Sequence, residues 1–166
     1  FNTDETWKYS FDKSFIDTDI TFGYETQTAE LRDMNLYPHG WNSEDFDDSL
    51  WENAVIKKDD DHELAEQITP NVESKIVTAQ KVINIEKKHF ILDFGKELAG
   101  QLVIDVKGTK GNKIHTYFGE ELNNDGSVRY DMRCNCKYEE YIILSGEVDH
   151  IVNFDARSLL KFKEMF

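Results

Sequence analysis

The chemistry that this sequence offers lies first in a short acidic and aromatic stretch, residues 41–51, which reads WNSEDFDDSLW. Trp41 and Trp51 supply flat aromatic surfaces, on which the C–H face of a sugar ring packs. Asp47 and Asp48 lie between them, and carboxylates either accept hydrogen bonds from sugar hydroxyls or coordinate Ca²⁺. This combination would suit a shallow carbohydrate site, with Ca²⁺ as a candidate cofactor.

Each of these side chains also has a purely structural interpretation. A tryptophan at the end of a turn commonly anchors the turn to the core, and this applies to Trp51. Trp41 differs because it follows Pro38 and Gly40 in a loop, and loops carry binding residues more often than core elements do. Aspartates in such a run also cap the backbone N–H groups of a turn. The residue types alone leave both interpretations open.

Other catalytic and metal-binding patterns are weaker. Glu120 and Glu121 suggest a glycosidase carboxylate pair, but neighbours in a strand point to opposite faces, so we do not expect them to act together. Residues 57–66 (KKDDDHELAE) lack the glycine and distal glutamate of a calcium loop and predict a solvated loop. Cys134 and Cys136 are too close for an unstrained disulfide, and they have no zinc-site spacing.

Composition restricts the class of protein. The formal net charge of -14 repels phosphate backbones, so we expect no nucleic-acid partner. No apolar run reaches membrane-spanning length, so no membrane partner is expected either. The chain begins at Phe1 without a methionine or a secretory signal, which leaves open whether the compartment is cytoplasmic or secreted. We expect residues 1–166 to be a single domain, cut from a longer protein.

The elements that must position the turn are β-strands. Residues 90–94 are a short apolar run, and residues 101–106 and 113–118 alternate between apolar and polar side chains. Glycines at 108 and 111, and the triplet at 124–126, mark turns between them. Three strands at this spacing predict an antiparallel sheet with one buried face. The fold class is therefore all-β, an antiparallel β-sandwich.

Further strands are expected on both sides of this centre, because β-branched and aromatic residues recur at strand-like spacing. They are expected within residues 7–11, 25–31, 51–56, 68–72, 74–85, 138–144, 149–153 and 158–166.

Three separated stretches resemble the bacterial α-L-rhamnosidases. Residues 40–51 carry GW followed by FDDSxW, and residues 93–100 (DFGKELAG) are similar to the family's DFGQ(N/E)xxG motif. The similarity continues through residues 118–122 (FGEEL) to Arg133 and residues 141–146 (YIILSG). It spans nearly the whole chain.

The resemblance implies a fold and a parent enzyme. Family members are multidomain glycoside hydrolases that remove terminal α-L-rhamnose, with catalytic carboxylates in a later all-helical barrel that this chain does not reach. The matching region would be a jelly-roll β-sandwich ahead of that barrel, which in some members is a calcium-dependent rhamnose-binding module. Glu25 matches the family's ETYDAR motif and joins the sugar-binding candidates, whereas Thr28 and Glu30 replace its aspartate and arginine.

Three functional hypotheses follow from these observations. The first is a non-catalytic carbohydrate-binding domain for terminal L-rhamnose or a similar sugar, with or without Ca²⁺. The second is a structural module that packs against the catalytic barrel and positions it, which the departures at Thr28 and Glu30 favour. An independent hydrolase is the third and weakest hypothesis, because no carboxylate pair can be placed at catalytic separation.

Overall fold

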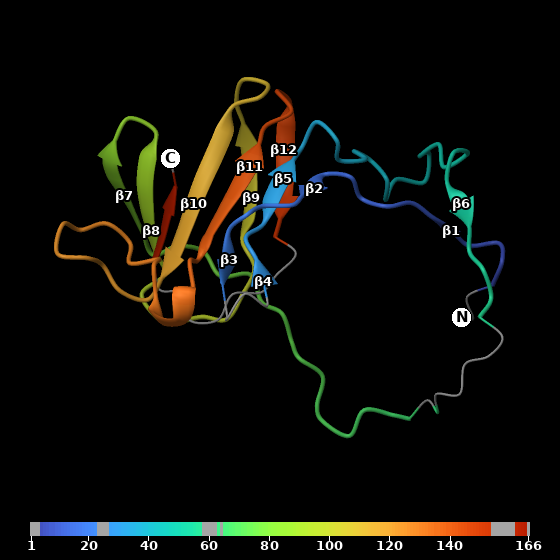
Figure 1. The fold of residues 1–166 in the computed structure, drawn as a ribbon, viewed down its shortest axis with the longest axis horizontal. Helices are drawn as coiled ribbons and strands as arrows, with labels where there is room; N and C mark the ends of the chain where they lie inside the picture. Colours follow the sequence, from blue (N-terminus) through green and yellow to red (C-terminus); the bar gives the residue numbers. More distant parts are fainter. Residues whose placement is uncertain (1–3, 23–26, 58–62, 64, 154–161, 166) are drawn as a thin grey trace. The chain divides into compact units, whose positions relative to one another are not determined.

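The structure is a computed structural model that describes residues 4–22, 27–57, 63, 65–153 and 162–165 (Figure 1). The chain divides into two compact units. The first unit comprises residues 1–12 and 38–76, and the second comprises residues 13–37 and 77–166. That residues 1–166 form one domain of a longer protein stays a prediction. Among the described residues, no helix is long and apolar enough to cross a membrane.

The second unit is built on a seven-stranded sheet. Its neighbours are antiparallel except for one parallel pair, in which Tyr141 lies opposite Leu31. In spatial order the strands are β2 (Phe15–Ile16), β5 (Leu31–Asp33), β11 (Glu139–Ile143), β10 (Lys113–Gly119), β13 (Phe162–Met165), β8 (His89–Asp93) and β7 (Lys81–Glu86). The short 3₁₀ helix η1 (Arg133–Asn135) lies in the loop between β10 and β11.

A second layer covers one face of this sheet. It consists of β9 (Val103–Lys107) paired with β12 (Val148–Val152). A hairpin of two short strands, β3 (Thr21–Phe22) and β4 (Gln27–Thr28), lies in the same unit. Ile151 of β12 packs with Ile142 of β11 in the main hydrophobic cluster, which Ile104 and Ile114 extend. The predicted all-β sandwich of jelly-roll type is confirmed. We call the face of the seven-stranded sheet opposite β9 and β12 its outer face.

The central stretch follows its predicted alternation. Thr116 and Phe118 of β10 are buried, Phe118 with only 1% of its surface exposed, whereas Lys113 is exposed. Phe118 packs with Leu102, the residue that precedes β9. The turn after β9 places Gly111 at φ +81°, a left-handed conformation that glycine adopts without strain. The period of two therefore identified both faces of these strands correctly.

Buried polar groups connect the two layers. The Arg32 guanidinium, on β5, donates from Nη1 to the backbone oxygen of Val152 at 2.8 Å and lies 4.6 Å from the centre of the Phe15 ring. Asn153, directly after β12, donates from its side-chain amide to the carboxylate of Glu140 on β11. These bonds fix the end of β12 against the main sheet because a buried polar group left unpaired would be costly.

Several expected strands are absent or shorter than predicted. Residues 68–72 form no strand, and Ile68 is 99% exposed. Within residues 74–85 only the part from Lys81 onward is a strand, and within residues 51–56 only Glu52 and Asn53 pair. The β-branched residues within 68–79 belong to no described strand pairing, and Pro70 cannot donate a ladder hydrogen bond. Strand propensity without a pairing partner did not produce a strand.

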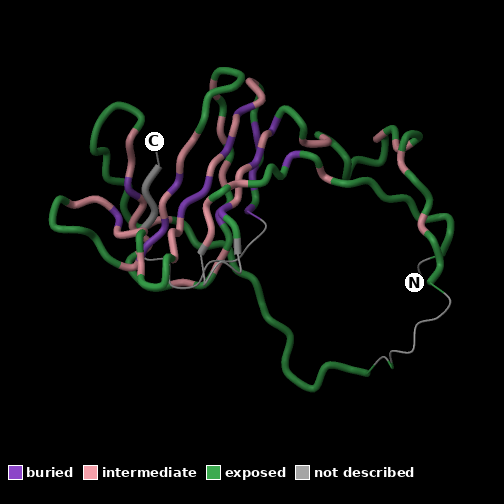
Figure 2. Tube along the Cα trace, in the orientation of Figure 1, coloured by how far each residue is buried: buried purple, intermediate pink, exposed green. Residues whose placement is uncertain are grey.

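The described part of the first unit has little regular secondary structure. Its only described strands, β1 (Lys8–Tyr9) and β6 (Glu52–Asn53), form a two-residue antiparallel ladder. None of its described residues is buried, and Figure 2 draws them in the colours of exposed and intermediate residues. Many of its large hydrophobic side chains are exposed: Trp7, Tyr9, Phe11, Trp41, Leu50, Val55, Ile56, Ile68, Val72 and Ile76.

Candidate functional site

The acidic turn of the first unit satisfies its own carboxylates. Asp47 Oδ1 accepts a hydrogen bond from the backbone N–H of Ser49 at 3.0 Å, which is the capping role of the structural interpretation. Hydrogen bonds from the side chain and backbone of Ser49 hold the pKa of Asp47 below its usual value. Asp48 Oδ1 forms an ion pair with Lys8 Nζ at 2.7 Å, which connects the turn to β1.

The aromatic candidates differ in exposure. Trp51 is half-buried, and its ring lies edge-on to Phe46 with centroids 5.5 Å apart. Trp41 is 49% exposed, in a turn where its backbone N–H donates to the Pro38 oxygen at 3.1 Å. Glu25 lies outside the described residues. The structure thus places Asp47, Asp48 and Trp51 in one turn, and Trp51 packs on Phe46 of that turn, which is not itself buried.

A calcium ligand set is incomplete in the described part of the chain. Ca²⁺ takes six to eight oxygen ligands, and the described residues contain no group of three or more acidic, histidine or cysteine side chains that could hold a metal ion. The two turn carboxylates are already engaged, Asp47 by Ser49 and Asp48 by Lys8. The described residues do not fit Ca²⁺, and we derive no role for the ion.

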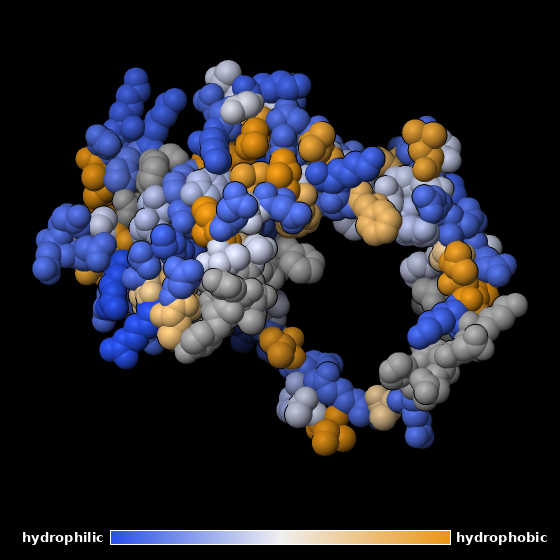
Figure 3. Space-filling model, in the orientation of Figure 1, coloured by the Kyte–Doolittle hydropathy of each residue, from blue (hydrophilic) through white to orange (hydrophobic). Residues whose placement is uncertain are grey.

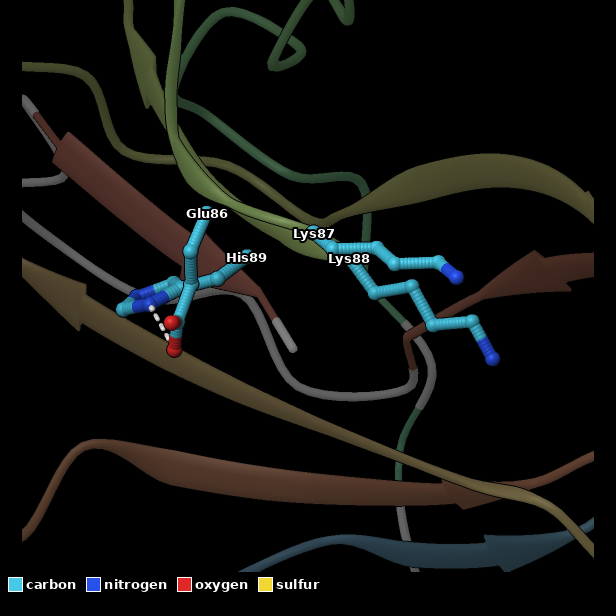
Figure 4. Close-up of a pocket in the computed structure, with 4 residues that line it drawn as sticks. All are labelled: Glu86, Lys87, Lys88 and His89. Atoms are coloured by element: carbon cyan, nitrogen blue, oxygen red, sulfur yellow. Dashed lines mark ion pairs between the residues drawn. The ribbon is translucent and has the colours of Figure 1, made fainter.

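A hollow of about 410 Å³ lies at the turn between β7 and β8 (Figure 4). Glu86, Lys87, Lys88 and His89 line it. Figure 4 shows the Glu86 and His89 side chains together on one side, with Oε1 and Nδ1 3.8 Å apart, while both lysine side chains extend to the other side. A binding site needs polar groups that converge on a ligand, and these diverge.

The outer face carries a cluster that sequence analysis did not single out. Rings and a cation follow one another across β10, β11 and the loop between them, and we call this row the outer-face ladder: Lys113, Tyr141, His115, Tyr117 and Tyr130. The ladder arises because His115 lies opposite Tyr141 in the strand pairing, and Tyr117 lies two residues further along the same face.

Successive members of the ladder are in close contact. The Lys113 ammonium lies 4.1 Å from the centre of the Tyr141 ring, a cation–π distance. The Tyr141 and His115 rings stack with centroids 4.1 Å apart, and His115 and Tyr117 follow at 4.2 Å. Tyr130, from the loop before η1, stacks on Tyr117 at 3.9 Å with 12° between the planes.

Glu139 of β11 lies against the ladder. It is 7% exposed, and its Oε2 accepts from the Tyr141 hydroxyl at 3.0 Å and bonds to His115 Nε2 at 2.8 Å. Within the part of the chain that the structure describes, Glu139 Oε1 has no hydrogen-bond partner. A buried carboxylate usually satisfies more of its acceptor capacity, because desolvating an unpaired acceptor is costly.

Burial determines the protonation of the ladder. It raises the pKa of Tyr141 to about 12, with a further contribution from the hydrogen bond to Glu139. Burial likewise raises the pKa of Tyr117. It lowers the pKa of His115, outweighing the nearby Glu139 carboxylate, which acts in the opposite direction. At neutral pH the tyrosines are therefore hydroxyl donors and the imidazole is uncharged.

Only part of this cluster can be identified from the sequence. Alternation along β10 places Lys113, His115 and Tyr117 on one face, and that much is visible in the sequence. It gives no reason to place Glu139 and Tyr130 beside them, because alternation does not reveal which strands are neighbours or where a loop returns.

Comparison with known proteins agrees with this architecture. Residues 83–157, which lie in the second unit, match the family model of the bacterial alpha-L-rhamnosidase concanavalin-like domain. An alpha-L-rhamnosidase from Streptomyces avermitilis is 29% identical over 106 residues, which cover 61% of this chain and 10% of that protein. The resemblance to the β-sandwich of α-L-rhamnosidases is thereby confirmed.

Two solved structures share the fold. The α-L-rhamnosidase from Dictyoglumus thermophilum superposes with a TM-score of 0.67 and 25% identity, covering 98% of this chain and 18% of that one. The Streptomyces avermitilis α-L-rhamnosidase complexed with L-rhamnose gives a TM-score of 0.55 and 25% identity, covering 82% of this chain and 14% of that one. This chain thus spans less than a fifth of these relatives.

Proposed function

We propose that this chain is a non-catalytic β-sandwich module of a longer glycoside hydrolase of the α-L-rhamnosidase type, and that it packs against the catalytic domain and positions it. The observation that supports this most is the lack of buried residues in the described part of the first unit. Its described residues include no buried one, yet it exposes large side chains such as Phe11, Leu50 and Ile68. Single exposed apolar residues are ordinary, but a unit of this kind without a core needs a covering partner.

The extended segment 65–76 adds to this support. Ile68, Val72 and Ile76 recur along it at intervals of four, each almost fully exposed, and Figure 3 shows hydrophobic side chains interspersed with hydrophilic ones along this stretch. Burying such side chains contributes about 1.5–3 kcal/mol each. A segment that leaves all of them in water is better suited to lie against another domain than to stand alone.

Amide hydrogen exchange tests this function. In the 166-residue chain alone we expect fast exchange in residues 38–57 and 65–76 and slow exchange in β10 and β11, because protection follows burial and stable hydrogen bonding. In the full-length glycoside hydrolase, residues 38–57 and 65–76 should exchange at least about tenfold more slowly, while β10 and β11 serve as the internal control. Equal exchange of these two segments in both proteins would contradict a packing role.

Carbohydrate binding at the acidic turn is the second candidate function. It is supported by the half-exposed Trp41 ring in a loop and by a relative solved with L-rhamnose. The ligand would be a terminal L-rhamnose or a similar sugar, resting on Trp41. Asp47 and Asp48 would contribute only by exchanging their present bonds to Ser49 and Lys8 for bonds to sugar hydroxyls.

A thermal-shift titration with L-rhamnose, with and without Ca²⁺, tests this candidate. A ligand that binds only the folded state raises the melting temperature by mass action, so sites of millimolar affinity are detectable. We expect the rise to disappear in Trp41→Ala and to persist in Trp7→Ala, a matched exposed tryptophan of the same unit. A rise only with Ca²⁺ would place the ion in the site. If the melting temperature rises neither with nor without Ca²⁺, the packing role is the only remaining candidate.

A further inference from the structure

The outer-face ladder combines the features of a ligand site rather than those of a sheet surface alone. It presents one ammonium from Lys113 and one carboxylate from Glu139, which balance in charge. Lys113 supplies a donor and Glu139 an acceptor beside aromatic surface, whereas the Tyr141 hydroxyl already donates to Glu139. Such a mixture suits a neutral ligand whose hydroxyl groups both donate and accept, because each hydroxyl then finds a partner without leaving a charge unpaired.

Glu139 is the most specific feature of this surface. Oε2 takes both described hydrogen bonds, from Tyr141 and His115, which fix the carboxylate in one orientation. Its Oε1 has no partner among the described residues, although the residue is 7% exposed. A charged acceptor held in place with one oxygen unused is ready to accept a ligand hydroxyl, and charge-assisted hydrogen bonds of this kind are the stronger ones.

Tyr130 supplies the surface for the ligand's apolar face. It is the last member of the ladder and is only half-buried. Among the described rings it stacks on Tyr117 alone. The inner rings His115 and Tyr117 each stand between two members of the ladder, so their faces are already occupied. A sugar ring would therefore stack at Tyr130 and direct hydroxyls along the ladder edge.

We propose that the outer face of the seven-stranded sheet holds a metal-independent site for a neutral monosaccharide unit, with Glu139 as hydroxyl acceptor and Tyr130 as stacking platform. This deepens the carbohydrate-binding candidate and differs from it in place, because the acidic turn belongs to the first unit and the ladder to the second. The two sites can fail independently.

The positions of the tryptophans allow one experiment to distinguish the two candidate sites. All three tryptophans, Trp7, Trp41 and Trp51, belong to the first unit, whereas every member of the ladder belongs to the second. Side-chain NMR of the 166-residue chain, titrated with methyl α-L-rhamnoside without metal, therefore reports the two locations separately. We expect the ring signals of His115 and Tyr130 to shift in a saturable manner.

Variants connect these shifts to the proposed contacts. Glu139→Gln keeps the shape of the side chain but removes its charge, and Tyr130→Leu removes the platform. Each should weaken binding at least about tenfold. Asp105→Asn is the matched control: its carboxylate also bonds a histidine, His150, at 2.7 Å on a sandwich strand, but it has no described ring stack beside it. That variant should bind like the parent.

Four outcomes would overturn the proposal. Three concern the isolated chain: shifts confined to the indole signals, which would place the sugar in the first unit; no shift anywhere up to the solubility limit of the sugar; and unchanged binding in Tyr130→Leu. If Glu139→Gln does not fold, the loop residue Tyr130 still decides the question. If the ladder signals move only on adding the rest of the glycoside hydrolase, the face is a domain interface and the sugar site is rejected.

Discussion

Two histidine–carboxylate pairs with the same chemistry have different surroundings. His115 bonds Glu139 at 2.8 Å on the outer face, and His150 bonds Asp105 at 2.7 Å on the second layer. The first pair is mostly buried among tyrosine rings, whereas both side chains of the second are more than half exposed. Exposed ion pairs contribute little to stability, so only the first pair can connect protonation to the fold.

The lowered pKa of His115 predicts how stability depends on pH. A histidine whose pKa is lower in the folded state binds protons preferentially in the unfolded state. Stability should therefore be complete above the unfolded pKa of about 6.5 and should decline as the pH falls below it. The cause is chiefly burial of the imidazole, which opposes its charged form.

Urea unfolding at a series of pH values checks this prediction. His115→Phe keeps an aromatic ring in the stack and removes the titration, so it should lose less stability than the parent on acidification. His150→Gln, at the exposed pair, should follow the parent. If the parent instead gained stability relative to His115→Phe in acid, attraction by the Glu139 carboxylate would outweigh burial, and the predicted direction would be wrong.

At the scale of elements, the sequence predicted those strands whose alternation is long enough to define a face. The buried positions of β10, Thr116 and Phe118, follow directly from period two. Residues 68–72 have similar β-branched content but form no strand, since pairing requires a neighbour and Pro70 lacks a donor. Propensity predicts that a segment can be a strand, while neighbours decide whether it becomes one.

The candidate sites show the same limit. The acidic turn was predictable because Asp47, Asp48 and Trp51 are close in sequence and adopt local capping and packing contacts. The ladder was not, because it joins β10, β11 and a loop residue, Tyr130, and period-two alternation cannot fix strand order or the path of a loop. Local contacts follow from spacing, but cross-strand contacts require the topology.

At the scale of the whole molecule, the two units differ in the source of their stability. The second unit has hydrophobic clusters between its layers, with Ile151, Met34 and Phe118 almost completely buried. The first has no buried residue among those described. Since hydrophobic burial is the dominant favourable term in folding, cooperative unfolding of the isolated chain should belong to the second unit.

This difference can be measured with one core substitution and the natural placement of the tryptophans. Phe118→Ala should destabilise the second unit by about 3–5 kcal/mol, because it leaves a cavity between the layers, and the melt followed by circular dichroism should shift accordingly. Tryptophan emission, which reports only the first unit, should show no cooperative change at that temperature.

Phe11→Ala, at a residue 81% exposed in the first unit, is the control and should leave the free energy of unfolding within about 0.5 kcal/mol of the parent. A tryptophan transition that coincides with the circular-dichroism melt, and moves with it in Phe118→Ala, would show that both units unfold as one and would remove the main support for a covering partner.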